Sequence, residues 1–264
     1  MGEMQLRGVV MSKLVLAMVV CICVGGTARA ADVTSCNQVV GPSEVGDLVA
    51  DLACGPGDYG VQLQHRAVLR LNGFRLTGRP GAQAVRCGLK RCAIEGPGTI
   101  AGAEVGVDIQ DFSKLYVRDV VFDGNRVAII GDQGPAYGGE NSRVLATNVI
   151  IRNSTLLGMV AGLFRVDGLV LENNADRGAW VRSLRGRNVI ATGNGLHGID
   201  ARQVISIKNL QATGNGGSGV HCDERVALRD STVTGNVGLD IDALRGRLVN
   251  TACGTSSLGL CAND

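Results

Sequence analysis

The 264-residue chain has a formal net charge of +2, 39 glycines and only 3% aromatic residues. This length suits one large domain or two small ones with a sizeable apolar core. The scarcity of aromatic residues excludes a globule packed around Phe, Tyr and Trp, and favours stacked Val, Ile, Leu and Ala with many tight turns. Basic residues lie scattered among acidic ones, so we expect a mixed, solvated surface and no nucleic-acid partner, which would require a basic patch or stripe.

The N-terminus has the pattern of a secretory signal peptide. Arg7 and Lys13 precede the apolar run Leu14–Val24, and small residues lead to an expected cut between Ala30 and Ala31. The run is too short to span a membrane as a helix, and no other stretch is long enough. We therefore expect a secreted protein, extracellular or periplasmic, without a membrane span once mature.

Internal repetition is the strongest signal in the chain. The segments "NVIATGNGLHGIDA" from Asn188, "NLQATGNGGSGVHC" from Asn209 and "DSTVTGNVGLDIDA" from Asp230 succeed one another every 21 residues. Each opens with Asn or Asp, continues with alternating apolar residues, turns at Gly-Asn and enters a second short strand. Gly-Asn suits a backbone at positive φ, because Gly lacks a Cβ and Asn tolerates the left-handed region. More diverged copies extend back to Asn72.

A repeat of this length with short strands and no amphipathic helix leaves few architectures. Leucine-rich repeats need a signature that is absent, and propeller blades are about twice as long. A parallel β-helix fits, because each coil supplies about three strands and equivalent residues stack at about 4.8 Å. Small aliphatic residues then point inward, and Asn188, Asn209 and Asp230 are able to form a hydrogen-bonded ladder.

Two features resemble a known family. The phrase "VLRLNGFRLTG" from Val68 to Gly78 and the Gly-Asn repeat are similar to secreted right-handed parallel β-helix proteins of the pectin-lyase-like superfamily. The resemblance covers most of residues 36–250. It implies an all-β, right-handed parallel β-helix, or solenoid, of about eight to nine coils. It says little about function, because this fold hosts lyases, hydrolases, epimerases and non-catalytic surface proteins.

The expected organisation is a single solenoid domain with capped ends. The segments are a signal peptide at 1–30, an N-terminal cap with the first disulfide at 31–66, β-helix repeats at 67–250 with an inserted loop at 131–143, and a C-terminal cap at 251–264.

Of nine cysteines, Cys21 and Cys23 fall in the signal peptide. Export permits the other seven to form disulfides, and an odd number leaves one thiol free or paired between chains. Cys222 is our candidate for that thiol, because its register places it inside among alanines. Connectivity does not follow from sequence, and zinc is the alternative ligand, although no C-x-x-C pair favours it. Sequence position suggests the pairs Cys36–Cys54, Cys87–Cys92 and Cys253–Cys261.

The similarity to catalytic β-helix proteins is partial. His197-Gly198 resembles half of the Gly-His-Gly of polygalacturonases, and Ser206-Ile207-Lys208 resembles their Arg-Ile-Lys without the arginine. Their Asp-Asp pair is missing, and paired carboxylates are the acid and base that glycoside hydrolysis requires. Pectate lyases use a calcium-binding carboxylate cluster, which has no linear match here. Calcium is implied only if the protein is a lyase, and no other cofactor or metal is expected.

The repeat itself places candidate site residues in one outward column. The residues six positions after each Gly-Asn asparagine, or its equivalent, are Trp180, Asp200, His221 and Asp242. Asp-His-Asp stacking can polarise an imidazole or hold a cation, and the only tryptophan can pack on a sugar ring. These acidic and imidazole groups are the tentative catalytic residues. The bland alternative is an ordinary polar outer face, in which alternating charge relieves repulsion.

Other candidates have simpler explanations. Asp123, Arg152 and Glu172 form a second outward column, which we interpret as a surface salt-bridge ladder. His197 lies in a turn and is expected to be solvated.

The step from Asp119 to Asn148 is longer than a regular coil, because residues 131–143 form a Gly- and Pro-rich insertion. Tyr137, Glu140 and Arg143 in this loop are either ligand contacts or part of a tolerated surface insertion.

Two functions remain open at this point. The favoured one is a non-catalytic β-helix that binds glycans or surfaces, or has a structural role, with an extracellular polysaccharide or cell-surface glycan as partner. The alternative is an extracellular lyase or hydrolase acting on an acidic, pectin-like polysaccharide through Asp200, His221 and Asp242.

Overall fold

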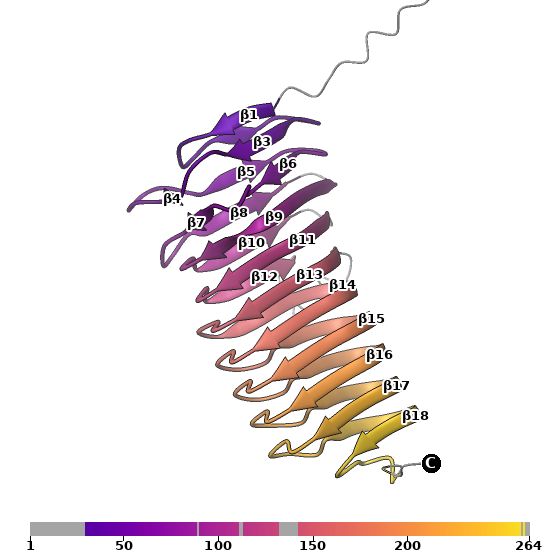
Figure 1. Cartoon of the computed structure of the whole chain (residues 1–264). Coiled ribbons are helices and arrows are strands. Elements are labelled where there is room, and N and C mark those ends of the chain that lie inside the picture. Colours follow the sequence, from indigo (N-terminus) through magenta and orange to yellow (C-terminus); the bar gives the residue numbers. More distant parts are fainter. Residues whose placement is uncertain (1–29, 89, 111–112, 132–141, 260, 262–264) are drawn as a thin grey trace, which may run out of the picture.

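The chain is a parallel β-solenoid of about ten turns, described by a computed structural model (Figure 1). The structure describes residues 30–88, 90–110, 113–131, 142–259 and 261. The expected signal peptide lies outside them, apart from its last residue, as does most of the 131–143 insertion. No helix in this described part of the chain has the length and apolarity needed to span a bilayer.

All 18 strands belong to one continuous ladder in which each strand pairs in parallel with its equivalent one coil away. From β14 onward a single strand bends around the coil and contributes to all three faces (Figure 1). The strands are β1 (Ala30–Val33), β2 (Val39–Val40), β3 (Val45–Leu48), β4 (Leu52–Ala53), β5 (Val61–Leu63), β6 (Val68–Arg70), β7 (Arg75–Thr77), β8 (Gln83–Cys87), β9 (Arg91–Ala101), β10 (Val105–Ile109), β11 (Lys114–Asp123), β12 (Val127–Gly131), β13 (Arg143–Arg152), β14 (Leu157–Glu172), β15 (Ala179–Thr192), β16 (Ile199–Thr213), β17 (Val220–Thr234) and β18 (Ile241–Cys253).

The expected count of eight to nine coils is too low, because the solenoid begins earlier in the chain. Residues 31–66 were expected to form a cap, yet β1 pairs with β3, β2 pairs with β5, and both continue into later coils. These coils lack the Gly-Asn turn that reveals the repeat. They keep the alternation that a coil requires, with Val61 and Leu63 buried on either side of exposed Gln62.

Each of the last four coils has three faces. The first face is formed by residues 179–181, 199–201, 220–222 and 241–243. The second face is formed by residues 183–187, 204–208, 225–229 and 245–249, and the third by residues 189–192, 210–213, 231–234 and 251–253. The sharp corner between the second and third faces is one residue in the left-handed region, with φ of 57° at Asn188 and Asn209 and 51° at Asp230.

The predicted ladder at this corner is confirmed between Asn188 and Asn209, whereas Asp230 is paired with Asn250 of the next coil. The side-chain amide of Asn209 donates to Asn188 Oδ1 over 3.0 Å, and that of Asn250 donates to Asp230 Oδ1 over 3.0 Å. Asn and Asp therefore serve two purposes here, since both tolerate positive φ and both carry an oxygen that accepts from the coil above.

A second, buried asparagine ladder fills the turns between the third and first faces. In each Gly-Asn pair only the glycine takes positive φ (64° at Gly193 and 65° at Gly214), whereas the asparagine turns inward. Asn194 Nδ2 donates to Asn215 Oδ1 over 2.9 Å, and Asn215 Nδ2 donates to Asn236 Oδ1 over 2.8 Å. The sequence interpretation assigned the left-handed turn to both residues, and it missed that the asparagines satisfy buried backbone groups.

Removing one member of the buried ladder should destabilise the solenoid strongly. Asn215 is fully buried, accepts from the backbone N–H of Asn194 over 3.1 Å and donates to the carbonyl of Ala191 over 3.1 Å. Asn215→Ala leaves these groups unpaired, so we expect the free energy of unfolding in urea to fall by about 2–4 kcal/mol.

The control is Asn209→Gly, which keeps the left-handed corner and removes an exposed amide. It should change the free energy of unfolding by only about 0.5 kcal/mol. Equal losses of unfolding free energy in the two variants would show that the buried ladder contributes no more to stability than the exposed one.

The core is one continuous stack of small and medium aliphatic side chains from Val33 to Ala243. Phe122 and Phe164 are its largest fully buried members. Burying each Val, Ile or Leu contributes about 1.5–3 kcal/mol. As expected from the composition, aliphatic columns rather than an aromatic cluster hold the coils together.

The cysteines pair as sequence position suggested. The disulfides are Cys36–Cys54, Cys87–Cys92 and Cys253–Cys261, and Cys222 is a free, buried thiol. Burial raises the pKa of the Cys222 thiol above its usual range, which keeps it protonated and unreactive.

Candidate functional site

The predicted column on the first face is present. Strand register pairs Trp180 with Asp200, Asp200 with His221, and His221 with Asp242. Their inward neighbours Ile199, Val220 and Ile241 are 0% exposed, so the column points out of the core as the repeat required. It is less open than expected, however, because Asp200 is only 7% exposed.

Arg177, in the turn before β15, covers the part of this column formed by Trp180 and Asp200. Its Nε lies 2.6 Å from Asp200 Oδ2, and its Nη1 lies 3.0 Å from Asp176 Oδ2. The guanidinium carbon also lies 5.4 Å from the centre of the Trp180 ring, a cation–π contact. Arg177 therefore balances the negative charge of Asp200. It also covers one face of Trp180, the residue that we expected to bind a sugar.

His197 is not the solvated turn residue that we expected. Its ring stacks on that of His221, with centroids 5.0 Å apart and planes inclined by 19°. The backbone N–H of Ser218 donates to His197 Nδ1 over 3.0 Å, so in the neutral ring the proton is on Nε2. The turn residues three positions before Trp180 and before Asp200 lie against the column, and that offset would have pointed to Arg177 and His197 from the sequence.

His221 is held between two carboxylates. Its Nδ1 lies 3.0 Å from Asp242 Oδ2, and its Nε2 lies 3.4 Å from Asp223 Oδ1. A general base needs a ring nitrogen that faces the substrate proton. In this arrangement both nitrogens face carboxylates, so the geometry resembles a structural network more than an acid–base pair.

Calcium does not fit this column. Among the described residues, no group of three or more His, Cys, Asp and Glu side chains is placed to hold a metal ion. The most buried carboxylate, Asp200, already has the guanidinium of Arg177 as its partner. The calcium that a lyase would need therefore has no place among these residues.

The stacked imidazoles predict acid sensitivity. Burial lowers the pKa of His197 below its ordinary value of 6.5, with His221 and Arg177 acting in the same direction and Asp200 and Asp176 opposing them. The unfolded chain then takes up a proton at His197 more readily than the folded one. Stability should fall as the pH drops below about 6.5 and level off below the folded-state pKa.

Urea unfolding of the parent protein and of His197→Gln, between about pH 7.5 and about pH 5, tests this. Glutamine retains an acceptor for the Ser218 N–H, and the variant should lose less stability on acidification. A His197 resonance that titrates at or above 6.5 by NMR would contradict the account.

The second outward column is a surface ion pair, as interpreted. Arg152 Nε lies 3.4 Å from Asp123 Oδ1, and strand register places Glu172 beside Arg152. Exposed pairs of this kind contribute little to stability.

The second face carries an excess of basic side chains that was not apparent from the sequence. We expected a mixed surface, but strand register brings basic residues from successive coils into three adjacent outward rows. A net charge near zero averages over the whole chain, and only the coil period shows that cations recur on one side. Twelve of the 26 Lys and Arg residues lie in these rows: Arg91, Lys114, Arg118, Arg143, Arg165, Arg185, Arg187, Lys208, Arg225, Arg229, Arg245 and Arg247.

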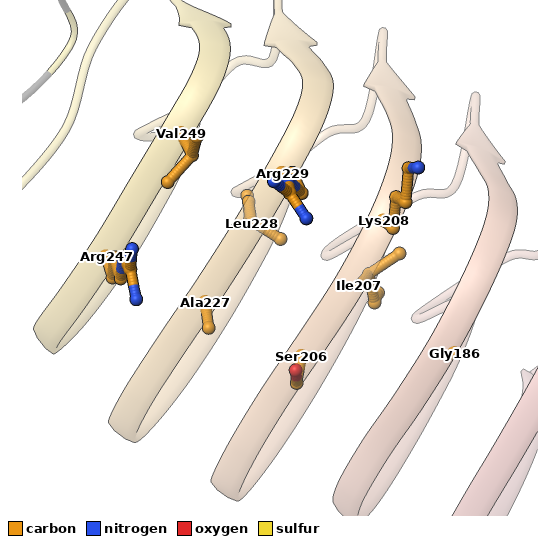
Figure 2. A pocket seen from close by; sticks show the side chains of 9 residues that line it. All are labelled: Gly186, Ser206, Ile207, Lys208, Ala227, Leu228, Arg229, Arg247 and Val249. Atoms are coloured by element: carbon orange, nitrogen blue, oxygen red, sulfur yellow. The ribbon is translucent and has the colours of Figure 1, made fainter.

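A hollow of about 380 Å³ crosses this face between β15 and β18, and we call it the basic groove (Figure 2). Small residues form its floor, and the cations Lys208, Arg229 and Arg247 stand around it on neighbouring strands (Figure 2). Its lining residues are Gly186, Ser206, Ile207, Lys208, Ala227, Leu228, Arg229, Arg247 and Val249.

The cations of the basic groove are only partly neutralised. Lys208 Nζ lies 3.8 Å from Asp230 Oδ2, and Arg229 Nε lies 4.0 Å from the same oxygen, so one carboxylate serves two cations at long range. Arg247 makes no ion pair with any residue in the described ranges. An anionic ligand would therefore find donors that are still available.

Two further hollows are lined by described residues. One, of about 300 Å³, lies on the same face; we call it the upstream hollow, and Arg143, a predicted ligand contact, lines it. The other, of about 150 Å³, lies near the N-terminal coils and includes Tyr59 and Arg86. None of these three hollows includes a member of the Trp180–Asp242 column. Tyr137, the other predicted contact in the insertion, lies outside the described residues.

Comparison with known proteins supports the fold. No family model and no curated protein matches the chain. Among solved structures, it is similar to full-length tailspike protein 2 from Escherichia coli O157:H7 bacteriophage CAB120, with a TM-score of 0.53 and 13% sequence identity. The similarity covers 86% of this chain and 38% of the tailspike chain. At this identity the likeness concerns the β-helix fold alone.

Proposed function

We propose that this protein is a secreted, non-catalytic β-helix that binds an acidic glycan through the basic groove. The observation that carries the proposal is the excess of cations around a solvent-facing hollow on one regular face. The three disulfides fit an oxidising compartment outside the cytoplasm, which supports secretion.

The spacing of the cations suits a chain of carboxylates. Lys208 and Arg229 occupy equivalent positions on neighbouring coils, and neighbouring strands lie about 4.7–4.9 Å apart. Arginine presents a planar fork of donors that matches a carboxylate in two-point contact. The small side chains of Ser206 and Ala227 leave room for a sugar ring between the cations.

The first face supports binding over catalysis. Its acidic and imidazole groups are paired with one another, and Arg177 is the partner of Asp200. The alternative function, a lyase or hydrolase acting on acidic polysaccharide, is favoured only by the stacking of Asp200, His221 and Asp242. It would require this network to open around the substrate.

The proposal predicts that binding depends on the groove cations. Calorimetric titration with polygalacturonate should show binding that weakens with added salt, because salt screens exposed charges. The double variant Arg229→Gln/Arg247→Gln should bind about two- to thirtyfold more weakly, since each exposed ion pair contributes about 0.2–1 kcal/mol.

The matched control is Arg126→Gln, which removes an exposed cation that pairs with Glu104 away from the second face. It should bind like the parent protein, and neutral dextran should not bind. Polygalacturonate should be recovered with no new reducing or unsaturated ends. New ends that disappear in His221→Ala would favour the enzyme, and equal binding by all variants would refute the proposed site.

A further inference from the structure

We infer that the basic groove and the upstream hollow are two ends of one track that holds a linear anionic glycan along the solenoid axis. This rests on the proposed function, and it adds a second subsite, a direction and a minimum ligand length. The upstream hollow is lined by Lys114, Tyr116, Arg143, Val144, Leu145, Leu163 and Arg165.

Strand register connects the two hollows by one row of outward residues. One outward row passes from the upstream hollow into the basic groove without a break in pairing. The upstream hollow ends at Arg165, whose partner Arg185 is next to Gly186 at the start of the basic groove. The members of the row, in order along the axis, are Tyr116, Leu145, Arg165, Arg185, Ser206, Ala227 and Arg247.

The upstream hollow offers the same chemistry as the basic groove. Arg143 and Arg165 are exposed, and neither makes an ion pair with a residue in the described part of the chain. The guanidinium carbon of Arg91 lies 4.4 Å from the centre of the Tyr116 ring. Arg91 covers one face of this ring, as Arg177 covers Trp180, so the cations Arg143 and Arg165 beside apolar Leu145 carry the argument for a sugar with a carboxylate.

Arg185 links the two hollows. It is exposed, and it occupies the outward position between Arg165 and Ser206 in the row. It makes no ion pair within the described ranges, so an anion that crosses from one hollow to the other meets a cation at this position as well.

The geometry sets a minimum length for the ligand. Neighbouring strands lie about 4.8 Å apart, so the row from Tyr116 to Arg247, which crosses seven strands, is about 29 Å long. A chain whose charges repeat near that spacing needs about seven units to span both hollows from end to end. Shorter chains reach only part of the row and lose part of the gain in effective concentration that linked contacts provide.

Titration with galacturonic-acid oligomers of about two to about ten units tests the track. Affinity should rise steeply until the oligomer has about seven units and then level off. For the longest oligomer, Arg143→Gln/Arg165→Gln should weaken binding by about two- to thirtyfold, and Arg185→Gln alone by about 1.4- to fivefold. Arg126→Gln serves as the control for the loss of one surface charge.

The outcomes separate this inference from the proposed function. If no acidic oligomer binds, both fail. If affinity levels off at three or four units and only Arg229→Gln/Arg247→Gln weakens it, the basic groove stands and the track is wrong. Binding of single-stranded DNA as tightly as of the longest oligomer would show a general polyanion surface and overturn the assignment to a glycan.

Discussion

Parallel pairing of each coil with the next, in register, is the constraint on which the rest of this structure depends. Every coil donates and accepts backbone hydrogen bonds along the axis, so residues at equivalent positions stack about 4.8 Å apart. The buried ladder through Asn194 and Asn215, the corner at Asn188 and Asn209, and the rows of surface charge all result from this register. A residue type that recurs at one position of the repeat therefore forms a column of stacked side chains along the solenoid.

Because the register is periodic, much of the structure could be predicted from the sequence. The period of 21 residues predicted the solenoid, the inward residues Ile199 and Val220, and the stacking of Asp200, His221 and Asp242. The coils formed by β1 to β5 could not be counted, because they lack the Gly-Asn turn and only their strand alternation persists.

The site was harder to predict than the fold, for two physical reasons. Turn residues are outside the strand alternation, so Arg177 and His197 were missed although both lie against the predicted column. Charge along the sequence is averaged over all faces of a coil, so the surface looked mixed. Cations such as Lys208 and Arg229 are far apart in the chain, and only coil stacking makes them neighbours.

The first and second faces use charge in opposite ways. On the first face, polar groups are paired within the protein, as in the ion pair of Arg177 with Asp200 and the hydrogen bond of His221 with Asp242, and the contacts hold turns and strands together. On the second face, cations outnumber the nearby carboxylates and surround hollows open to solvent. Charges that are paired internally stabilise a surface, whereas charges in excess attract a partner of opposite sign.

The most direct measurement is a crystal structure of the protein with a bound galacturonic-acid oligomer. The account predicts that the oligomer lies along the second face, with carboxylates beside Arg229 and Arg247. An oligomer seated on Trp180 and His221 of the first face, with Arg177 displaced from Asp200, would contradict it.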